Sequence, residues 1–205
     1  MSGRDNIILL GPLATGKSLI AQHLSMVTGR SNHPVDKLKW YYRHKNGYDL
    51  ATSTNILRNQ GFEALINYAQ RYFGTNDLKH LLHKFKGIID LGASDTHCSD
   101  HAKFNELAKV FYPYQNVFLL LPSKDHSESI DILSQRLVKR YEHDELKRPV
   151  IDSYLKMNEM FIRSESTRML AKHIVYTKGR PIHGIVDEIV QKCCLNSYHK
   201  LYKVS

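Results

Sequence analysis

The sequence predicts an α/β fold of three layers, in which a central parallel sheet of about five strands lies between layers of helices. Two observations lead to this fold class. Short apolar runs alternate along the chain with longer amphipathic stretches, which is the pattern of a sheet wrapped by helices. The apolar runs hold Val, Ile, Leu or Phe at most positions, as strands buried on both faces require. No internal repeat or low-complexity linker interrupts the pattern, so we expect a single domain over residues 1–195.

The position of each element follows from these patterns and from the turn residues between them. Strands are expected at 6–10, 87–91, 116–121 and 172–176, with a weaker one at 32–35. Helices are expected at 17–28, 61–73, 77–85, 101–110, 127–141, 151–163 and 182–194. Residues 36–60, rich in aromatic residues and lysine, read as a helical insertion, and residues 196–205 read as a basic tail.

The composition indicates a chain that binds anions. The net charge is +9 with histidines neutral, and a positive field concentrates anions nearby. ATP accounts for part of this charge; nucleic acid, a phosphorylated metabolite or solubility alone are the alternatives. No apolar run approaches the about 18 residues of a membrane-spanning helix, and the three cysteines form no disulfide framework. We therefore expect a cytoplasmic protein without a membrane partner.

A glycine-rich loop follows the first expected strand. Residues 11–18 read GPLATGKS, which fits the pattern G-x-x-x-x-G-K-S, with the run IILL before it and the amphipathic stretch SLIAQHL after it. Gly11 and Gly16 let the backbone curl closely around phosphate groups. The loop N–H groups and the start of the following helix attract anions. The sequence therefore predicts a site for ATP and Mg²⁺.

The chemistry of this loop gives its residues separate roles. Lys17 reaches the β and γ phosphates, and the Ser18 hydroxyl is a ligand of Mg²⁺. The loop residues expected to bind the nucleotide are Gly11, Ala14, Thr15, Gly16, Lys17, Ser18 and Leu19.

Two aspartates are the candidate acids of the site. Asp90 ends the strand expected at 87–91, where P-loop enzymes use an acid to hold Mg²⁺, usually through water. The alternative is that Asp90 only caps the turn into Gly92. Asp36 follows the weak strand, where a carboxylate would face the γ-phosphate and orient or deprotonate an attacking hydroxyl. The alternative for Asp36 is a helix N-cap.

An arginine-rich segment at 140–150 is a candidate lid. Arg140 closes one expected helix, Arg148 opens the next, and Pro149 suits a first helical turn. A charged segment between two helices can close over a nucleotide, and the Arg148 guanidinium can then neutralise charge on the transferring phosphoryl group. A solvated loop is the alternative.

Together these motifs resemble the shikimate kinase family of small P-loop kinases, over about residues 5–192. Besides the glycine-rich loop, the resemblance rests on R-L-x-x-R ending at Arg140, on Arg148-Pro149, and on Gly179-Arg180-Pro181 after the last strand. It implies a P-loop kinase fold with a helical lid. It also implies that Arg140 and Arg180 flank adenine, that Arg148 touches the γ-phosphate and that Asp36 faces the acceptor hydroxyl.

The acceptor side departs from the family's pattern. Where the family has D-x-D, this chain has Pro34-Val35-Asp36, so only the second acid is present. The family's Phe-Arg pair, whose arginine grips the substrate carboxylate, corresponds to Phe62-Glu63. Met157 lies near the place of a second such arginine, while a shift of register would bring in Arg58. We expect a retained phosphate half and an acceptor other than shikimate.

Two further clusters have structural and functional interpretations. Residues 95–101, DTHCSDH, fit no usual zinc spacing and are expected to line the acceptor pocket or to cap the next helix. Trp40, Tyr41 and Tyr42 could stack on an aromatic ligand, but packing of the insertion against the sheet is favoured.

The sequence therefore predicts an ATP-dependent kinase that transfers the γ-phosphate to a hydroxyl of an unidentified small molecule. Lys17, Asp36 and Arg148 are the expected catalytic residues, and Ser18 and Asp90 the expected metal site. A nucleoside, nucleotide or polynucleotide kinase is the first alternative. A nucleotide-binding regulatory protein without phosphotransfer is the second. A monomer or a homodimer is expected.

Overall fold

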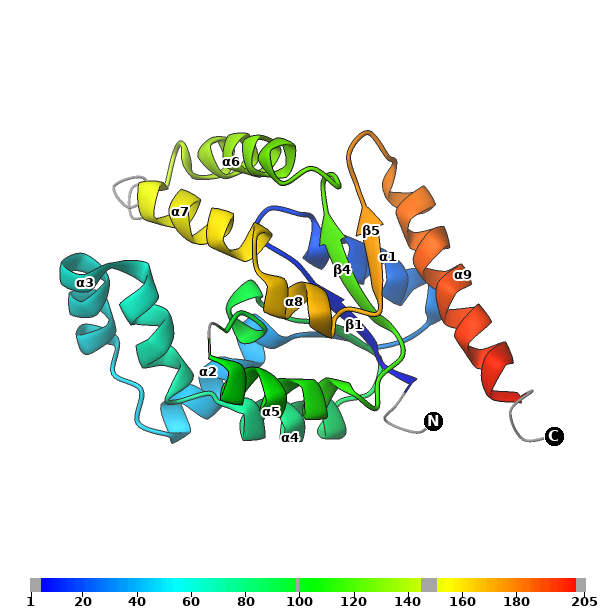
Figure 1. Cartoon of the computed structure of the whole chain (residues 1–205), viewed down its shortest axis with the longest axis horizontal. Helices are drawn as coiled ribbons and strands as arrows, with labels where there is room; N and C mark the ends of the chain where they lie inside the picture. Colours follow the sequence, from blue (N-terminus) through cyan, green and yellow to red (C-terminus); the bar gives the residue numbers. More distant parts are fainter. Residues whose placement is uncertain (1–4, 99, 145–150, 202–205) are drawn as a thin grey trace.

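The computed structural model describes residues 5–98, 100–144 and 151–201 and confirms the expected fold class (Figure 1). Five parallel strands form one sheet in the order β2-β3-β1-β4-β5. The strands are β1 (Ile7–Leu10), β2 (Asn32–Pro34), β3 (Ile88–Asp90), β4 (Val117–Leu121) and β5 (His173–Tyr176). The helices are α1 (Lys17–Thr28), α2 (Val35–Lys45), α3 (Leu50–Gln70), α4 (Thr75–Lys84), α5 (His101–Phe111), α6 (His126–Tyr141), α7 (Ile151–Ile162), α8 (Glu165–Leu170) and α9 (Ile182–Leu201), with a short 3₁₀ helix, η2, at Ala93–Asp95.

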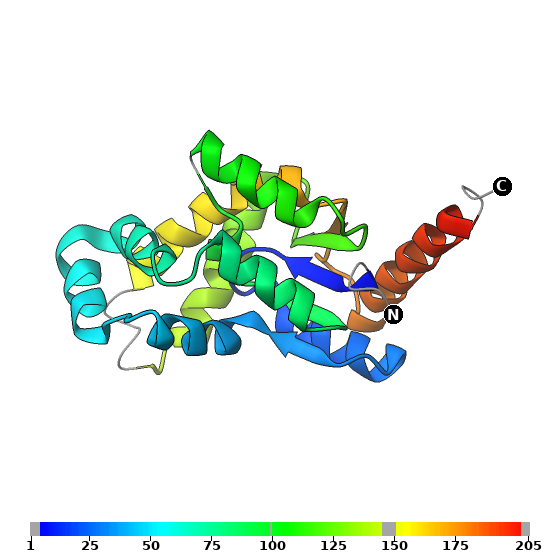
Figure 2. The same ribbon diagram turned by 90° about the horizontal axis from the view of Figure 1, so that it is seen from below.

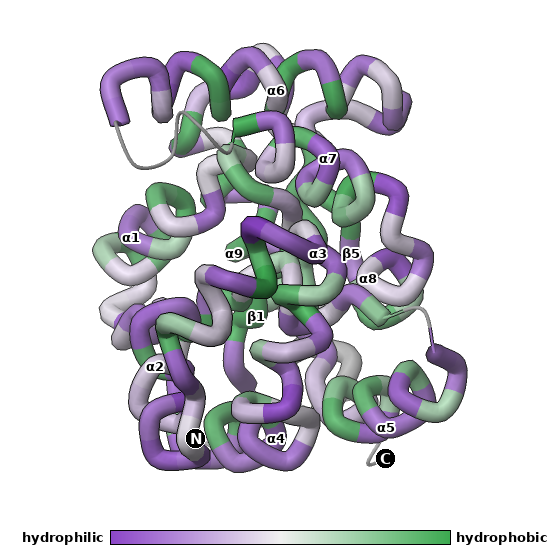
Figure 3. The backbone as a smooth tube through the Cα atoms, turned by 90° about the vertical axis from the view of Figure 1, so that its left-hand side faces the viewer, coloured by the Kyte–Doolittle hydropathy of each residue, from purple (hydrophilic) through white to green (hydrophobic). Residues whose placement is uncertain are grey.

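The sheet is buried on both faces, because successive side chains of a strand point to opposite sides. In β1, Ile7 and Leu9 pack with apolar residues of α1 and α9, whereas Ile8 and Leu10 pack with those of α4 and α5. Figure 3 shows the hydrophobic segments gathered in the middle of the molecule, around β1. Burial of each such aliphatic side chain contributes about 1.5–3 kcal/mol, so these two layers of contacts hold the sheet in place.

The strand order places the functional loops side by side. In the parallel register Leu9 of β1 lies opposite Asp90 of β3, so the two strands end at the same edge of the sheet. The loop after β1 therefore begins beside the carboxylate that ends β3. In Figures 1 and 2, α3 projects beyond the sheet next to α7, and side chains of the two helices, among them Ile66 and Met157, form a small apolar cluster of their own.

The observed element boundaries agree closely with those expected for the strands and for most helices. The insertion is helical, as expected, and its second part shares the label α3 with the helix expected at 61–73. The two helices are separated by a kink at Gly61, whose backbone is not helical (φ +82°, ψ −173°). The helix start expected at residue 61 therefore coincides with the break. The first part of the insertion forms α2.

Two helical features were not expected. The short helix α8 has Ser164 as its N-cap. The Ser164 side chain accepts a hydrogen bond from the N–H of Thr167. Helix α9 ends at Leu201, so it continues into the segment 196–205 that the composition sets apart.

Candidate active site

The loop between β1 and α1 follows a path that its glycines permit. Gly11 has φ +145°, and a Cβ there would lie 2.5 Å from the backbone oxygen of Leu120 in β4. Gly16, at the start of α1, has φ +92°, in the left-handed region that favours glycine. Ala14 has φ +60°, which costs a non-glycine residue about 1–2 kcal/mol. Backbone strain of this kind concentrates at ligand-binding sites.

The first turn of α1 presents its N–H groups toward this loop. Gly16 is the N-cap, and among the described residues no side chain caps the helix. The first N–H groups of a helix have no intrahelical partner, and the helix dipole adds positive potential there. Lys17 Nζ lies 3.4 Å from the backbone oxygen of Pro12, so the ammonium group lies against the loop, and the Thr15 hydroxyl donates to the same oxygen. The arrangement suits an anion such as a polyphosphate.

Ser18 and Asp90, the two expected metal ligands, are in direct contact. The Ser18 hydroxyl donates a hydrogen bond of 2.7 Å to Oδ2 of Asp90, which is buried. Burial raises the pKa of the Asp90 carboxyl, and the charge of Lys17 and the Ser18 hydrogen bond oppose this without cancelling it. Hydroxyl and carboxylate oxygens are ligands that Mg²⁺ prefers. The surrounding cations do not fully offset the charge of the buried Asp90 carboxylate. The Ser18–Asp90 pair therefore fits a Mg²⁺ ion.

Two helices hold the glycine-rich loop from the other side. The Asn158 side chain in α7 accepts a 2.7 Å hydrogen bond from the N–H of Leu13 and donates a longer one to its carbonyl. Arg136 in α6 donates to the carbonyl of Ala14 at 3.3 Å. Asn158 was not predicted from the sequence, although a polar residue between the buried Met157 and Phe161 is a signal that could have identified it. The helices on either side of the expected lid are thus attached to the glycine-rich loop.

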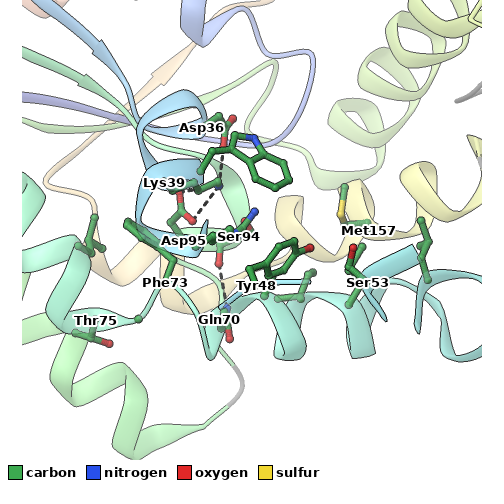
Figure 4. A pocket seen from close by; sticks show the side chains of 18 of the residues that line it. Asp36, Lys39, Tyr48, Ser53, Gln70, Phe73, Thr75, Ser94, Asp95 and Met157 are labelled. Atoms are coloured by element: carbon green, nitrogen blue, oxygen red, sulfur yellow. Dashed lines mark hydrogen bonds and ion pairs between the residues drawn. The ribbon is translucent and has the colours of Figure 1, made fainter. Parts of the chain in front are cut away.

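Asp36 belongs to a charged cluster rather than to a helix cap. The N-cap of α2 is Pro34, and Asp36 lies in the first turn. Lys39, one turn later and 95% buried, places its Nζ 2.6 Å from Asp36 Oδ1 and 3.2 Å from Oδ1 of Asp95 in η2 (Figure 4). The Asp95 carboxylate also accepts the N–H of Gly92 at 3.1 Å. The cluster joins α2 to the turn after β3.

The electrostatics of this cluster keep Asp36 ionised. Partial burial raises the pKa of the Asp36 carboxyl, but Lys39, by charge and hydrogen bond, and then Lys17 and Arg43 lower it below its ordinary value. Burial lowers the pKa of Lys39, but the charges of Asp95 and Asp36 outweigh this and raise it. The side chain of Asp36 is 65% exposed, so its carboxylate is open to a ligand while Lys39 and Asp95 are enclosed.

A pocket of about 430 Å³ opens beside Asp36, between α2, α3 and α7 (Figure 4). This volume is within the range of small-molecule sites. Trp40, 47% exposed, lies on its wall, whereas Tyr42 packs on the apolar core with its ring 5.7 Å from that of Phe73. The favoured packing role is thus seen for Tyr42 but not for Trp40. As expected for the segment 95–101, Asp95 lines the pocket and Asp100 caps α5.

Other candidate residues lie in different surroundings. Arg140 is exposed at the end of α6, with its guanidinium 5.6 Å from the Tyr141 ring centre. Arg180 pairs with Glu188 of α9 and donates to the carbonyl of Gly184. Arg148 and most of the expected lid lie outside the described residues.

The residues that the alignment places near the acceptor do not all line the same pocket. Met157 lines the pocket beside Asp36, as its alignment implies. Glu63 lines a separate, smaller pocket of about 210 Å³, and Arg58 is exposed on α3 and lines neither. Glu63 therefore does not line the pocket onto which Asp36 opens. The cations that do line the pocket, Lys39, Arg43 and Lys103, were not singled out from the sequence.

Comparison with known proteins places the fold. No family model and no curated protein matches the sequence. The shikimate kinase from Acinetobacter baumannii in complex with shikimate superposes with a TM-score of 0.57 at 17% identity, covering 93% of each chain. The shikimate kinase from Aquifex aeolicus gives a TM-score of 0.55 at 18% identity, covering 94% of this chain and 98% of that one. A gluconokinase from Sinorhizobium meliloti 1021 gives a TM-score of 0.62 at 13% identity, covering 100% of both chains.

The chain has a shikimate kinase-like P-loop fold. At these identities the similarity concerns the arrangement of the elements, so the chemistry has to be argued from the side chains. In this shikimate kinase-like fold none of the described helices has both the length and the apolar composition that crossing a bilayer requires.

Proposed function

We propose that this protein is an ATP- and Mg²⁺-dependent kinase that transfers the γ-phosphate to a hydroxyl group of a small molecule bound beside Asp36. One observation carries the proposal: Ser18, next to Lys17 in the glycine-rich loop, donates a 2.7 Å hydrogen bond to the buried Asp90, which ends the strand beside β2. Asp36 follows β2 and opens onto a pocket of small-molecule size, and the charge of Lys17 favours the ionised form of both acids. A kinase needs these three groups in this relation.

Each group has a role that its surroundings support. The N–H groups of the loop and of the first turn of α1 bind the phosphates, together with Lys17. Ser18 and Asp90 would hold Mg²⁺, which supplies neutralisation of phosphate charge when bound. Arg136 and Asn158 fix the loop that carries these groups.

Asp36 orients the acceptor. As the bond from the acceptor oxygen to the γ-phosphorus forms, the bond from that phosphorus to ADP breaks and the hydroxyl proton is lost. The lowered pKa of Asp36 makes it a weak base, but phosphoryl transfer depends mainly on positioning. An ionised Asp36 accepts the hydroxyl hydrogen bond, and its exposure lets the proton pass on to solvent.

Three arginines also have roles in the proposed reaction. The resemblance to shikimate kinases favours a role for Arg148 in stabilising the transferring phosphoryl group and places for Arg140 and Arg180 beside adenine. Arg180 would first have to leave its ion pair with Glu188.

The decisive experiment combines nucleotide binding and turnover. ADP formation is measured with Mg-ATP against shikimate, sugars, polyols, hydroxy acids, nucleosides and a 5′-hydroxyl oligonucleotide. We expect acceptor-dependent ADP formation that Lys17→Ala abolishes and that Lys109→Ala, an exposed change on α5, leaves intact. Unchanged ATP affinity in Lys17→Ala would refute the phosphate site. ATP binding without turnover on any acceptor would instead favour the regulatory protein.

A nucleoside or polynucleotide acceptor is the second candidate, and Trp40 is the observation that favours it. Its half-exposed indole lies on the pocket wall, where a base could stack. Turnover with nucleosides, or oligonucleotide binding that weakens steeply with salt, would distinguish this candidate from the first.

A further inference from the structure

The charged residues around the pocket beside Asp36 are not balanced. Among the described residues that line it, the carboxylates are Asp36 and Asp95, and the cations are Lys39, Arg43 and Lys103. Lys39 bonds to both carboxylates. Arg43 and Lys103 are left facing the pocket without a carboxylate of their own. Arg43 and Lys103 are each partly buried, and two cations without an ion pair among the described residues concentrate anions in the cavity that they line.

Arg43 is held in place by aromatic rings instead of by an acid. Its guanidinium carbon lies 5.6 Å from the ring centre of Trp40 and 5.3 Å from that of Tyr48, and the two rings meet edge to face. Its Nε is buried and, in the part of the chain that the structure describes, has no hydrogen-bond partner. Stacking fixes the guanidinium plane and leaves its N–H groups for a ligand.

Lys103 comes from the opposite side, on α5. Its Nζ donates to the side-chain oxygen of Gln70, the one hydrogen-bond partner it has among the described residues, and the Gln70 amide donates in turn to the carbonyl of Ser94. Burial lowers the pKa of Lys103, and the nearby Cys98, Asp100 and Glu106 oppose this without cancelling it. No carboxylate of the described residues forms an ion pair with Lys103. The ammonium group therefore keeps donors that a ligand could use.

Among the polar residues of the remaining wall, Tyr48, Thr75 and Ser94 present side-chain hydroxyl groups, whereas other polar groups have their donors engaged. Ser53 and Thr54 both donate their hydroxyl hydrogens to the carbonyl of Leu50 at 2.8 and 2.9 Å, and Gln70 is engaged at both ends. The rest is largely apolar, with Leu50, Leu57, Leu65, Ile66, Phe73 and Met157 among the lining residues. Apolar walls with a few placed charges select an apolar body with a few polar groups.

We propose that the acceptor is an apolar, ring-bearing molecule with one hydroxyl group and one anionic group, a carboxylate or a phosphate monoester, and that Arg43 and Lys103 bind the anion while Asp36 receives the hydroxyl. The inference rests on the proposed kinase function for the role of the hydroxyl. The anion site itself stands on Arg43 and Lys103 alone. It differs from a site for a polyhydroxylated acid, in which most contacts are hydrogen bonds to hydroxyls.

Calorimetric binding without nucleotide tests the anion site separately from turnover. The ligands are 4-(hydroxymethyl)benzoate, its neutral match 4-(hydroxymethyl)benzamide, 4-(hydroxymethyl)phenyl phosphate and gluconate. We expect at least one aromatic anion to bind about 10-fold or more tighter than the amide, and Lys103→Gln to weaken it about 10- to 100-fold. Arg43→Gln should weaken it similarly. The matched controls are Lys109→Gln on the same helix and Arg58→Gln on α3, both exposed and outside the pocket.

Each result of these binding measurements has a distinct meaning. The anion that binds more tightly identifies the group recognised, carboxylate or phosphate. The inference is overturned if the amide binds as well as the anions, if gluconate binds better than both, if Lys103→Gln leaves the preference unchanged, or if neither anion binds at millimolar concentration. Anion binding without ADP formation from any acceptor would leave the anion site standing and remove the kinase proposal instead.

Discussion

The charged cluster of Asp36, Lys39 and Asp95 depends on the absence of a side chain at Gly92. A Cβ on this residue would lie 2.5 Å from Asp36 Oδ1, 2.9 Å from Lys39 Nζ and 3.0 Å from Asp95 Oδ2. Its φ of −68° is ordinary for any residue, so a methyl group would act on the three charged groups and not on the backbone.

Gly92→Ala is therefore expected to impair turnover rather than folding. A displacement of about 1 Å at a catalytic group can reduce the rate about 100-fold, so we expect kcat to fall about 10- to 100-fold with ATP affinity unchanged. Steady-state kinetics and nucleotide titration measure this. Gly184→Ala in α9, where the nearest atom to a new Cβ is 3.8 Å away, is the control. Equal effects of the two changes would contradict the steric argument.

Lys39 is expected to stabilise the fold over a wide range of pH. Its raised pKa means that its contribution is complete below the ordinary lysine value of 10.5 and is lost only as pH rises through the raised value. The lowered pKa of Asp36 means that its contribution is complete above the ordinary value of 3.8 and is lost as pH falls through the lowered one. Between these limits Lys39 and Asp36 are both ionised.

Lys39→Met should accordingly lower the free energy of unfolding by about 3 kcal/mol near neutral pH, because it leaves the buried Asp95 carboxylate unpaired. The difference from the unmodified protein should be constant from about pH 5 to about pH 9 and should shrink below about pH 4. Urea titrations across this range measure it. Lys39→Met combined with Asp95→Asn should recover much of the loss, whereas a loss of the same size in the double variant would point to packing instead of charge.

The residues of the site differ in how far the sequence could reveal them. The phosphate loop, Ser18 and Asp90 were predictable because a local pattern specifies them and parallel strands bring them together. Lys39 was not, because a lysine in a basic and aromatic stretch has the composition of an exposed face. Its burial depends on Asp95, 56 residues away, and the Leu13–Asn158 contact spans 145 residues.

At the scale of the elements, α3 is a bent wall of the pocket. Gly61 separates a first part that supplies Leu50, Ser53 and Leu57 to the pocket from a second part that supplies Gln70. Its φ and ψ lie in a region open essentially to glycine alone. The bend therefore sets the angle between the two parts of the wall.

Gly61→Ala should strain or straighten α3, at a cost of about 1–3 kcal/mol. Because no hydrogen bond joins α3 to the phosphate loop in the described structure, we expect the KM for the acceptor to rise and the Kd for ATP to stay the same. Gly29→Ala, at the left-handed C-cap of α1, is the matched control, since it carries similar strain (φ +67°) outside the pocket. A similar rise in KM for both variants would indicate a general effect of instability.

Element prediction succeeded where local signals agree and failed where tertiary contacts decide. The strands and α1 were found because apolar runs and turn residues coincide. Gly61 marks the kink in α3 correctly, but the packing of both parts of α3 against one pocket was not visible in the sequence. Ser164 is an N-cap signal for α8 in the sequence, but the helix has only six residues and was not predicted.

At the scale of the molecule, segments from nearly the whole chain lie together at one edge of the sheet. The loop after β1, the end of β3, the helices α2 and α3 of the insertion, and the pair α6 and α7 all meet there. Ligands at the edge should therefore stabilise the molecule as a unit, because each contact ties together segments that are distant in sequence.

Mg-ATP is expected to raise the melting temperature of the whole protein. A ligand at about 100 times its Kd adds about 2.7 kcal/mol, which for a chain of this size is about 5–10 °C. Ser18→Ala should lose the Mg²⁺-dependent part of this shift, measured from its own unliganded baseline, because it removes a metal ligand and the hydrogen bond to Asp90. Ser127→Ala, an exposed serine at the start of α6, should keep the full shift. If ATP shifts the melting temperature equally with Mg²⁺ and with a chelator, then Ser18 and Asp90 hold no metal, and the phosphate loop binds the nucleotide by charge and backbone N–H groups alone.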